Sequence, residues 1–286
     1  MTITSNHLLS RYLIGMPHLS AVGLSEQWLL KECGHQHWLA LAQACGKLVP
    51  EFYDRRGNKV YAAFVCVEVN NARLDAVQEN DELEMATELT RLSASRNISS
   101  HVIMKADRVV ARVMMLSTFV YREECGNNQS VAKTEIVMSA SADNPSLSAQ
   151  AFLLLKQHKQ LRHYQPAIVG RFIYQPCPYS DFNGADFLYF AAFQQVADRA
   201  EQAFISEMGN HASLWITQRR SLFYYGNINI GDSLIVELSS CTMKANTMAV
   251  EMRIKRNSDG FVLMDIIYQK SQAVLAKQLP IYRKEA

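Results

Sequence analysis

A chain of 286 residues can hold one large domain or two of ordinary size, and its net charge of +2 gives no basic field that would favour nucleic acid or an anionic membrane as a partner. The hydrophobic share of 49% and the charged share of 20% are those of a globular protein, and no apolar run reaches the roughly 18 residues that could span a membrane. The N-terminus lacks a signal-peptide pattern, and the six cysteines are irregularly spaced without a C-x-x-C pair. We therefore expect a cytoplasmic protein with reduced, mostly buried thiols.

The first predicted element is a helix over residues 23–46, GLSEQWLLKECGHQHWLALAQACG. Ser25 can accept a hydrogen bond from the first turn, and Gly46 can end the helix in the left-handed conformation. Gly34 is expected to divide the helix into two segments, because glycine weakens a helix interior. Apolar side chains cover most of the surface, so we expect this helix to be largely buried.

Four strands are predicted after this helix, because β-forming residues occur there in runs that are bounded by polar turns. The predicted strands cover residues 60–69, 81–94, 99–107 and 108–123. The last two are typical of a hairpin whose turn lies near Asp107 and Arg108.

The second half begins with another predicted helix, over residues 184–208, with Asn183 as its N-cap. Asp186 follows three residues later, at the spacing of a capping box. Strands are then predicted over residues 219–228, 232–243, 247–256 and 261–276. The sequence Asn257-Ser258-Asp259-Gly260 indicates a hairpin turn before the last of them.

A buried helix followed by strands thus occurs twice along the chain. This order predicts an α+β protein and argues against alternating βαβ units. We expect two domains, residues 1–145 and 180–286, each a sheet wrapped around its own helix, with an antiparallel sheet continuous between them. Residues 146–179 are expected to form a linker that contains a short helix over residues 147–161.

The segment Asp181-Phe182-Asn183-Gly184-Ala185-Asp186 lies at the expected start of the second helix. The first amides of a helix lack intrahelical acceptors and lie at the positive end of its dipole. Gly184 would let a ligand approach the backbone, so a thioester carbonyl bound there could have its developing negative charge stabilised. A good N-cap with nothing bound explains the same residues. Gly23 and Leu24, at the start of the first helix, offer a second pair of amides.

Other polar residues do not form a known catalytic motif in the sequence. His35 and His37 are two residues apart and face different ways on a helix, so no metal site is predicted. His18 could bind substrate near the first helix or have a structural role. Arg219 and Arg220 form an isolated basic pair, expected on the solvated surface, with a phosphopantetheine phosphate as the alternative ligand.

The pattern D-x-N-G-A-D-x-x-Y-F over residues 181–190 resembles the helix start of acyl-CoA thioesterases of the hot-dog superfamily. In that family, an aspartate at the position of Asp181 acts as nucleophile or base, and histidine usually follows the glycine. Ala185 stands at the histidine position here.

Over most of its length the chain resembles more closely the double hot-dog acyltransferase/decarboxylases of polyketide biosynthesis, the leinamycin type. The resemblance is carried by Gly15-Met16-Pro17, the helix over 23–46, the strand start over 57–64, Asn80-Asp81 and the DFNGAD segment. It implies a double hot-dog fold with a key active-site tyrosine at Tyr61. Members take a malonyl or methylmalonyl group from coenzyme A, decarboxylate it, and load the acyl group onto an acyl carrier protein.

The resemblance and the residues together make Tyr61 and Asn183 the candidate catalytic residues. The candidates for binding substrate are Asp181, Gly184, Ala185, Gly23, Leu24 and His18. The reaction needs no metal and no cofactor beyond the coenzyme A thioester and the carrier's phosphopantetheine, and a tyrosine hydroxyl could accept the acyl group or transfer a proton. Two alternatives stay open: a hydrolytic thioesterase that uses Asp181, and a non-catalytic acyl-binding protein. A homodimer is an open alternative to a monomer.

Overall fold

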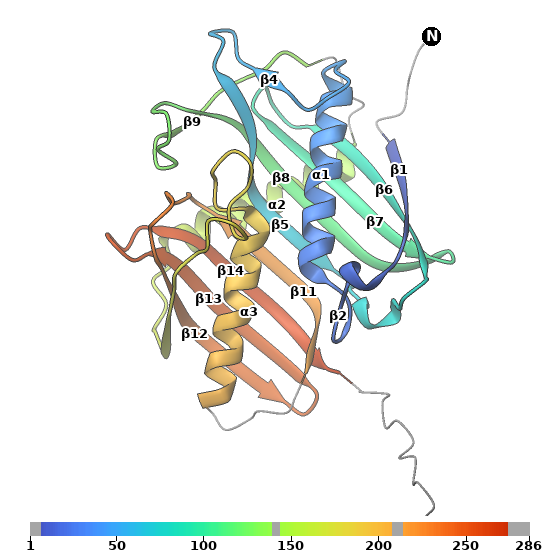
Figure 1. Ribbon diagram of the computed structural model, residues 1–286, viewed down its shortest axis with the longest axis vertical. Helices are drawn as coiled ribbons and strands as arrows, with labels where there is room; N and C mark the ends of the chain where they lie inside the picture. Colours follow the sequence, from blue (N-terminus) through green and yellow to red (C-terminus); the bar gives the residue numbers. More distant parts are fainter. Residues whose placement is uncertain (1–6, 139–143, 208–213, 274–286) are drawn as a thin grey trace, which may run out of the picture.

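The chain forms one large antiparallel sheet that holds two helices on its inner face and one on its outer face (Figure 1). The computed structural model describes residues 7–138, 144–207 and 214–273. Over these residues the sheet has 12 strands, in the order β1-β6-β7-β8-β5-β11-β14-β13-β12-β10, with β4 paired to β5 and β9 paired to β8. None of the helices in these ranges is long and apolar enough to cross a membrane.

The elements of the two halves follow one another in nearly the same order. The first half contains β1 (His7–Leu13), a 3-10 turn (Met16–His18), β2 (Leu19–Ser20), β3 (Gly23–Leu24), α1 (Glu26–Ala44), β4 (Phe52–Tyr53), β5 (Lys59–Asn70), a second 3-10 turn (Leu74–Ala76), β6 (Glu82–Arg91), β7 (Arg96–Lys105), β8 (Arg108–Arg122) and β9 (Val131–Lys133). The second half contains β10 (Gly170–Tyr174), α3 (Phe190–Glu207), β11 (Trp215–Tyr224), β12 (Leu234–Lys244), β13 (Thr247–Arg256) and β14 (Val262–Gln272), and α2 (Pro145–His163) lies between the halves in sequence.

The internal repeat is confirmed by the sheet order. The first half runs β1-β6-β7-β8-β5, and the second half, read from its outer edge, runs β10-β12-β13-β14-β11. Strands β5 and β11 join the halves as antiparallel neighbours, with Cys66–Val69 paired against Arg220–Phe223. The expected α+β class and the continuous antiparallel sheet are therefore both present. Strand β10, which pairs with β12, lies within residues 146–179, the stretch expected to be a linker.

Helix α1 is capped as its sequence predicts but is not divided. The Ser25 side chain accepts a hydrogen bond from the Trp28 amide, and Gly46 ends the helix with φ of +67°. Only His35 and Gln43 of α1 are exposed, so the expected burial is confirmed. The expected break at Gly34 is wrong, because this glycine serves close packing: a Cβ atom there would lie 2.7 Å from the ring of Phe190. Helix α1 thus approaches α3 at a point where no side chain fits.

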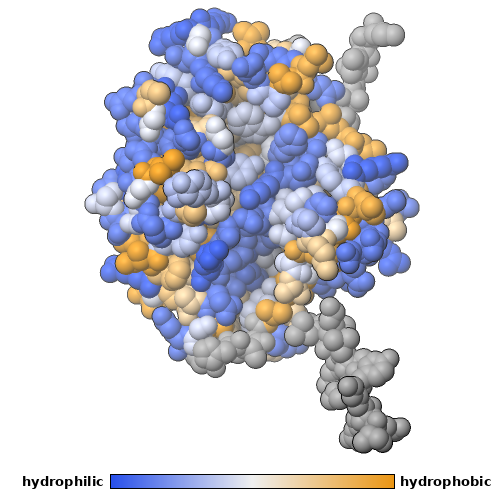
Figure 2. Space-filling model, viewed as in Figure 1, coloured by the Kyte–Doolittle hydropathy of each residue, from blue (hydrophilic) through white to orange (hydrophobic). Residues whose placement is uncertain are grey.

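Helix α3 begins at Phe190, six residues after the predicted start, so Asn183 is not its N-cap and Asp186 does not complete a capping box. The helix otherwise follows the prediction, with its apolar side buried against the sheet. Hydrophilic side chains form a band across the middle of the molecular face that carries α1 and α3 (Figure 2). Both helices therefore turn their apolar sides inward.

The predicted strands agree with the structure within a few residues, with one larger shift. The strand predicted over 219–228 lies at Trp215–Tyr224, because the chain leaves β11 after Tyr224 to line the cavity described below. The strand predicted over 261–276 corresponds to β14, and residues 274–276 of that prediction lie outside the described part of the chain. The predicted turns are present at Ala106–Asp107 and at Gly260, all with positive φ. Only Cys33 and Cys66 are buried among the six free cysteines, so the expectation of mostly buried thiols is wrong.

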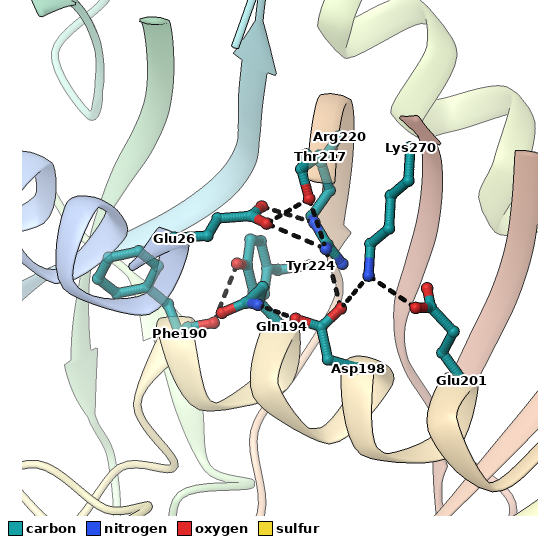
Figure 3. A network of polar contacts seen from close by, with 9 residues as sticks. All are labelled: Glu26, Phe190, Gln194, Asp198, Glu201, Thr217, Arg220, Tyr224 and Lys270. Carbon is teal, nitrogen blue, oxygen red and sulfur yellow. Dashed lines mark hydrogen bonds and ion pairs between the residues drawn. The ribbon is translucent and has the colours of Figure 1, made fainter. Parts of the chain in front are cut away.

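A buried cluster of charges lies where the two helices meet the junction strand β11 (Figure 3). The side chain of Arg220 is fully buried, and its Nε lies 2.6 Å from Glu26 Oε1 of α1 while its Nη2 lies 2.9 Å from Asp198 Oδ1 of α3. Lys270 Nζ of β14 contacts Asp198 at 2.9 Å and Glu201 Oε1 at 2.8 Å. The expectation that Arg220 is solvated is therefore wrong, because Glu26 and Asp198 neutralise it in the interior. The pair is split: Arg219 is exposed on the other face.

The cations of this cluster keep Asp198 ionised. Burial alone would raise the pKa of Asp198, but the charges of Arg220 and Lys270 outweigh it and hold that pKa well below its usual range. Since the folded-state pKa is depressed, the stabilising effect is fully present above the ordinary aspartate pKa and is lost as the pH falls below it. The first turn of α1 and the middle of α3 are thus tied to one strand by charge.

Substitution of Gly34 by alanine should lower stability even though alanine is the better helix former. The propensity gain of about 1 kcal/mol is opposed by the clash with Phe190, whose ring is held by Phe64 and Tyr189 at centroid distances of 4.5 and 4.8 Å. We expect a net loss of about 1–2 kcal/mol in the free energy of urea unfolding. In a Phe190→Leu background the same Gly34→Ala change should be neutral or stabilising. Equal stability of Gly34→Ala and wild type would contradict the close approach.

The two adjacent arginines of β11 offer a matched test of the charge cluster. Arg220→Met should cost roughly 3–5 kcal/mol of unfolding free energy, because it leaves Glu26 and Asp198 buried without their cation. Arg219→Met should cost under about 1 kcal/mol, since its side chain is 64% exposed and 3.9 Å from Glu68. Chemical denaturation at neutral pH measures both. Similar losses for the two variants would show that the cluster does not hold the halves.

Candidate functional site

A cavity of about 790 Å³ opens where β5 and β11 diverge. Strand β5 pairs with β11 only through Cys66–Val69, and with β4 only at Lys59 and Val60. Between these contacts, over residues 61–65, its edge away from β8 has no partner strand in the described part of the chain. The register against β8 shifts between Phe64 and Cys66, so a bulge at Val65 marks the point of divergence. The sheet therefore has a gap between its two halves.

The cavity reaches both faces of the sheet through this gap. All residues from Val60 to Val65 line it, and successive strand residues point to opposite faces. Val60 and Ala62 belong to the apolar cluster that contains α1 residues Ala40 and Leu41, so they point to the inner face. Tyr61 lies between them in sequence and points to the outer face.

Tyr61 is surrounded by aromatic and cationic groups. Its ring makes an edge contact with Phe187, at a centroid distance of 5.1 Å and an interplanar angle of 79°. The guanidinium of Arg122 lies 4.3 Å from the Phe187 ring and 5.9 Å from the Tyr61 ring, and Lys59 Nζ lies 6.0 Å from the Tyr61 ring. The Tyr61 hydroxyl forms no hydrogen bond with another residue that the structure describes, and it lines the cavity. It is therefore available to a ligand in the cavity.

Asn183 shapes the loop that faces Tyr61 across the gap. Its Oδ1 accepts hydrogen bonds from the amides of Ala185, at 3.0 Å, and Phe187, at 3.2 Å. Because that oxygen serves the loop, it cannot cap α3, which explains the later helix start. Asn183, Gly184 and Ala185 all line the cavity, so the structure brings them together with Tyr61. The Ala185 amide is already used, however, and the carbonyl of Ala185 accepts from Arg122 at 2.6 Å.

Asp181 is buried beneath this loop and does not line the cavity. Its Oδ2 accepts from the Tyr174 hydroxyl at 2.9 Å and from the Cys177 amide at 2.8 Å, and its Oδ1 accepts from the Ser180 hydroxyl at 3.0 Å. The bond from Tyr174 ties the loop to β10, and the other two stay within the segment that follows the strand. The geometry gives Asp181 a structural role.

Gly23, Leu24 and His18 lie apart from the cavity, near the start of α1. Gly23 has φ of +110°, and a Cβ atom there would lie 2.2 Å from the Leu74 carbonyl oxygen. Leu24 is buried and pairs with Leu19 in a two-stranded ribbon. His18 Nδ1 accepts from the Gly15 amide at 2.9 Å, and its ring packs on Trp28. The structure thus does not join these residues to Tyr61.

Sequence reasoning missed the charge of the cavity wall. Five cationic residues line the cavity, and no aspartate or glutamate is among the described residues that do so; the cations are Lys59, Arg96, Lys133, Arg162 and Arg256. Of these, Arg256 is paired with Asp259 at 2.6 Å. The other four come from four segments of the sequence, so only the sheet register brings them together. A cavity lined by cations and without a described carboxylate favours an anionic ligand.

His158 of α2 lines the outer end of the cavity. Its Nε2 lies 2.8 Å from the Tyr224 carbonyl oxygen, and its ring packs on Tyr225 at a centroid distance of 4.7 Å. Burial lowers the pKa of His158, and the charges of Arg162 and Arg96 lower it further. No group of three histidine, cysteine, aspartate or glutamate side chains that could hold a metal ion occurs in the described ranges.

Comparison with solved structures identifies the fold of this chain. No family model and no curated protein matches the sequence. Among solved structures, the chain is similar to a 12:0-ACP thioesterase from Umbellularia californica, with a TM-score of 0.63 at 10% identity over 94% of this chain and 95% of that one. An acyl-ACP thioesterase from Bacteroides thetaiotaomicron gives a TM-score of 0.57 at 11% identity over 93% of this chain and 98% of that one. The chain has a double hot-dog fold. At these identities the likeness establishes the fold and leaves the chemistry to the site.

The loop role of Asn183 can be tested by stability alone. Asn183→Ala should lower the unfolding free energy by about 1 kcal/mol, because the amides of Ala185 and Phe187 lose their acceptor. Asn183→Asp keeps an acceptor oxygen in place and should stay within about 0.5 kcal/mol of wild type. Thermal and urea unfolding of both variants provide the measurement. Equal loss in both variants would argue that the amide nitrogen, not the oxygen, organises the loop.

Proposed function

We propose that this chain processes an anionic acyl thioester in the cavity beside Tyr61. The observation that carries the proposal is the pairing of a free tyrosine hydroxyl with a cavity wall of Lys and Arg side chains and no described carboxylate. A coenzyme A thioester carries phosphates, and a malonyl or methylmalonyl thioester carries a carboxylate as well. The fold likeness to acyl-carrier-protein thioesterases supports the same substrate class.

The reaction we propose is decarboxylation of a malonyl or methylmalonyl group. The carboxylate departs as carbon dioxide, and the electron pair of the broken carbon–carbon bond forms an enolate whose charge rests largely on the thioester oxygen. A proton then adds to the α-carbon and gives the acetyl or propionyl thioester. The enzyme must stabilise the enolate oxygen and supply that proton.

The first turn of α3 is suited to hold the enolate oxygen. Phe190, its first residue, lines the cavity, and the leading amides of a helix lack intrahelical acceptors. The Ala192 amide already donates to the Tyr189 carbonyl at 2.8 Å, which leaves the amides of Phe190 and Ala191 for the enolate oxygen. This donor replaces the Gly184 and Ala185 pair expected from the sequence, since the Ala185 amide donates to Asn183. The side-chain nitrogen of Asn183, which also lines the cavity, could donate to the substrate as well.

Tyr61 is assigned the proton transfer or the covalent step. As a general acid its hydroxyl would protonate the enolate carbon and recover its proton from solvent. As an acyl acceptor its oxygen would bond to the thioester carbon, and coenzyme A would leave as the thiol with the tyrosine proton. Transfer to a carrier protein ends both routes: the phosphopantetheine thiol gains the acyl group and gives its proton to the departing group. No metal takes part in either route.

Hydrolysis by Asp181 has less support in the geometry. Its carboxylate accepts three hydrogen bonds within the loop, and Ala185 stands where related thioesterases place histidine. A non-catalytic acyl-binding protein would have the same cavity, so a measurement of turnover is needed to distinguish it from the proposed enzyme. A cytoplasmic location and the choice between monomer and homodimer stay predictions.

Removal of one oxygen from Tyr61 tests the proposal. Tyr61→Phe should lower turnover of malonyl- or methylmalonyl-CoA on the order of 10²–10⁴-fold if the hydroxyl is a general acid, while the Phe187 contact is kept. If the hydroxyl accepts the acyl group, transfer should be abolished, and wild type without a carrier should gain acyl mass at Tyr61. Carbon dioxide release and intact-mass spectrometry measure these outcomes.

Tyr53→Phe is the matched control, because Tyr53 lies on neighbouring β4, is 48% exposed and does not line the cavity. It should keep wild-type turnover. Tyr61→Phe with wild-type turnover would remove Tyr61 from the chemistry. Binding of the thioester without turnover by the wild type would favour the acyl-binding alternative, and release of malonate without carbon dioxide would favour the thioesterase.

A further inference from the structure

Helix α2 lies on the outer face of the sheet, across the junction of the two halves (Figure 1). Its residues Leu147, Ala151 and Leu154 pack in one cluster with side chains of β5, β7, β8 and β11. Its C-terminal end is held by Arg253, whose Nη1 and Nη2 donate to the carbonyls of Tyr164 and Leu161 at 2.7 and 3.0 Å. The helix is therefore a fixed element of the outer surface and has no freedom to act as a loose linker.

The free side of α2 is basic and carries no acidic residue. The helix, PSLSAQAFLLLKQHKQLRH, contains five basic residues and no aspartate or glutamate; they are Lys156, His158, Lys159, Arg162 and His163. Lys156, Lys159 and His163 are exposed and lie on one side of the helix, at spacings of three and four residues. Phe152, which is 68% exposed, continues this side toward the N-terminus. For a chain of net charge +2, this is a local concentration of positive charge.

The same helix forms part of the cavity wall. Leu155, His158 and Arg162 line the cavity from α2, and Arg96 of β7 lines it beside them. The Arg162 guanidinium lies 5.9 Å from the centroid of the Tyr225 ring, and the His158 ring packs on the same tyrosine at 4.7 Å, so these groups lie together at one end of the cavity. Neither Arg96 nor Arg162 forms an ion pair with a carboxylate in the described parts of the chain, whereas Arg253 and Arg256 are paired with Asp265 and Asp259. The outer surface of α2 thus leads directly to a cationic mouth.

We infer that the exposed side of α2 docks an acidic carrier protein and that Arg162 and Arg96 receive the phosphate of its phosphopantetheine arm. Positive charge along the helix complements an acidic partner and favours its correct orientation. Arginine pairs are suited to a phosphate at the mouth, from which the arm can extend toward Tyr61. This inference rests on the proposed function for the identity of the partner, but the docking itself requires no chemistry.

A membrane surface fits these observations less well. An interfacial helix buries a continuous apolar side in lipid, whereas the apolar side of α2 packs on the sheet. Only Phe152 and Leu153 among the exposed α2 residues are large and apolar, and both lie away from the cavity mouth.

Charge reversal on α2 provides the test. Lys156→Glu with Lys159→Glu changes two exposed residues that do not line the cavity. The control is Arg108→Glu with Lys244→Glu, the same change of charge at exposed ends of β8 and β12. The probe is an acidic acyl carrier protein of bacterial fatty-acid synthesis, in apo and holo forms, and binding is measured by calorimetry at two salt concentrations.

The α2 variant should bind both forms at least roughly tenfold more weakly than wild type, and the control should bind as wild type does. Arg162→Gln should weaken binding of the holo form only, because the apo form lacks the phosphate. Unchanged binding in the α2 variant, or an equal loss in the control, would overturn the inference. So would the finding that the reversal abolishes binding to phosphatidylserine vesicles while carrier binding is unchanged.

Turnover of malonyl-CoA without a carrier separates this inference from the proposed function. If wild type binds the carrier through α2 but turns over no acyl thioester, the docking surface stands and the proposed reaction fails. If the α2 variant retains both turnover and carrier loading at wild-type rates, the reaction stands and the docking surface is wrong.

Discussion

The burial of Arg220 is the constraint on which the arrangement of the two halves depends. A guanidinium without solvent must be neutralised, and the carboxylates that do so come from different helices, Glu26 on α1 and Asp198 on α3. Apolar packing alone would tolerate small displacements of these helices along the sheet. Charge pairs with contact distances near 3 Å tolerate them much less. The cluster therefore fixes the position of α3 relative to β11 and α1, and with it the position of Phe190 in the cavity wall.

Backbone geometry then produces the cavity. Strands β5 and β11 remain paired for only four residues each, and the bulge at Val65 turns β5 away from its neighbour. A gap in a sheet exposes unpaired backbone groups, which is normally unfavourable. Here the loop of Asn183 and Arg122 covers part of the gap, with Arg122 donating to Ala185 and to Asn128. The site is thus a gap in the pairing of β5 and β11, and residues on both faces of the sheet line the cavity there.

The sequence predicts the regular parts of this molecule well. Strands and their turns were found because side chains alternate with a period of two and because turn residues are specific; α1 was found because Ser25 and Gly46 mark its ends. The start of α3 was missed because an asparagine oxygen accepts amides in a loop as readily as at a helix end. The break predicted at Gly34 is wrong because a glycine is needed there for contact with Phe190, 156 positions away in the sequence. Local helix propensity contains no information on that contact. The sequence cannot predict which of Arg219 and Arg220 is buried. Neighbouring strand residues point to opposite faces, and only the tertiary structure shows which face is covered. The cations around Tyr61 were missed for the same reason, because strand register alone gathers them.

Both halves place a register shift in the strand at the junction, between Phe64 and Cys66 in β5 and between Thr217 and Arg219 in β11. In the first half, the shift opens the cavity. In the second half, the Ala72 amide donates to the Gln218 carbonyl and the Arg219 side chain donates to Asn70. These bonds fill the equivalent position. Two structurally equivalent positions have therefore diverged within one polypeptide. A homodimer of single domains could not do this, because each substitution would appear at both positions at once. Covalent linkage of the halves gives one site per chain and lets the other position specialise in holding the chain together.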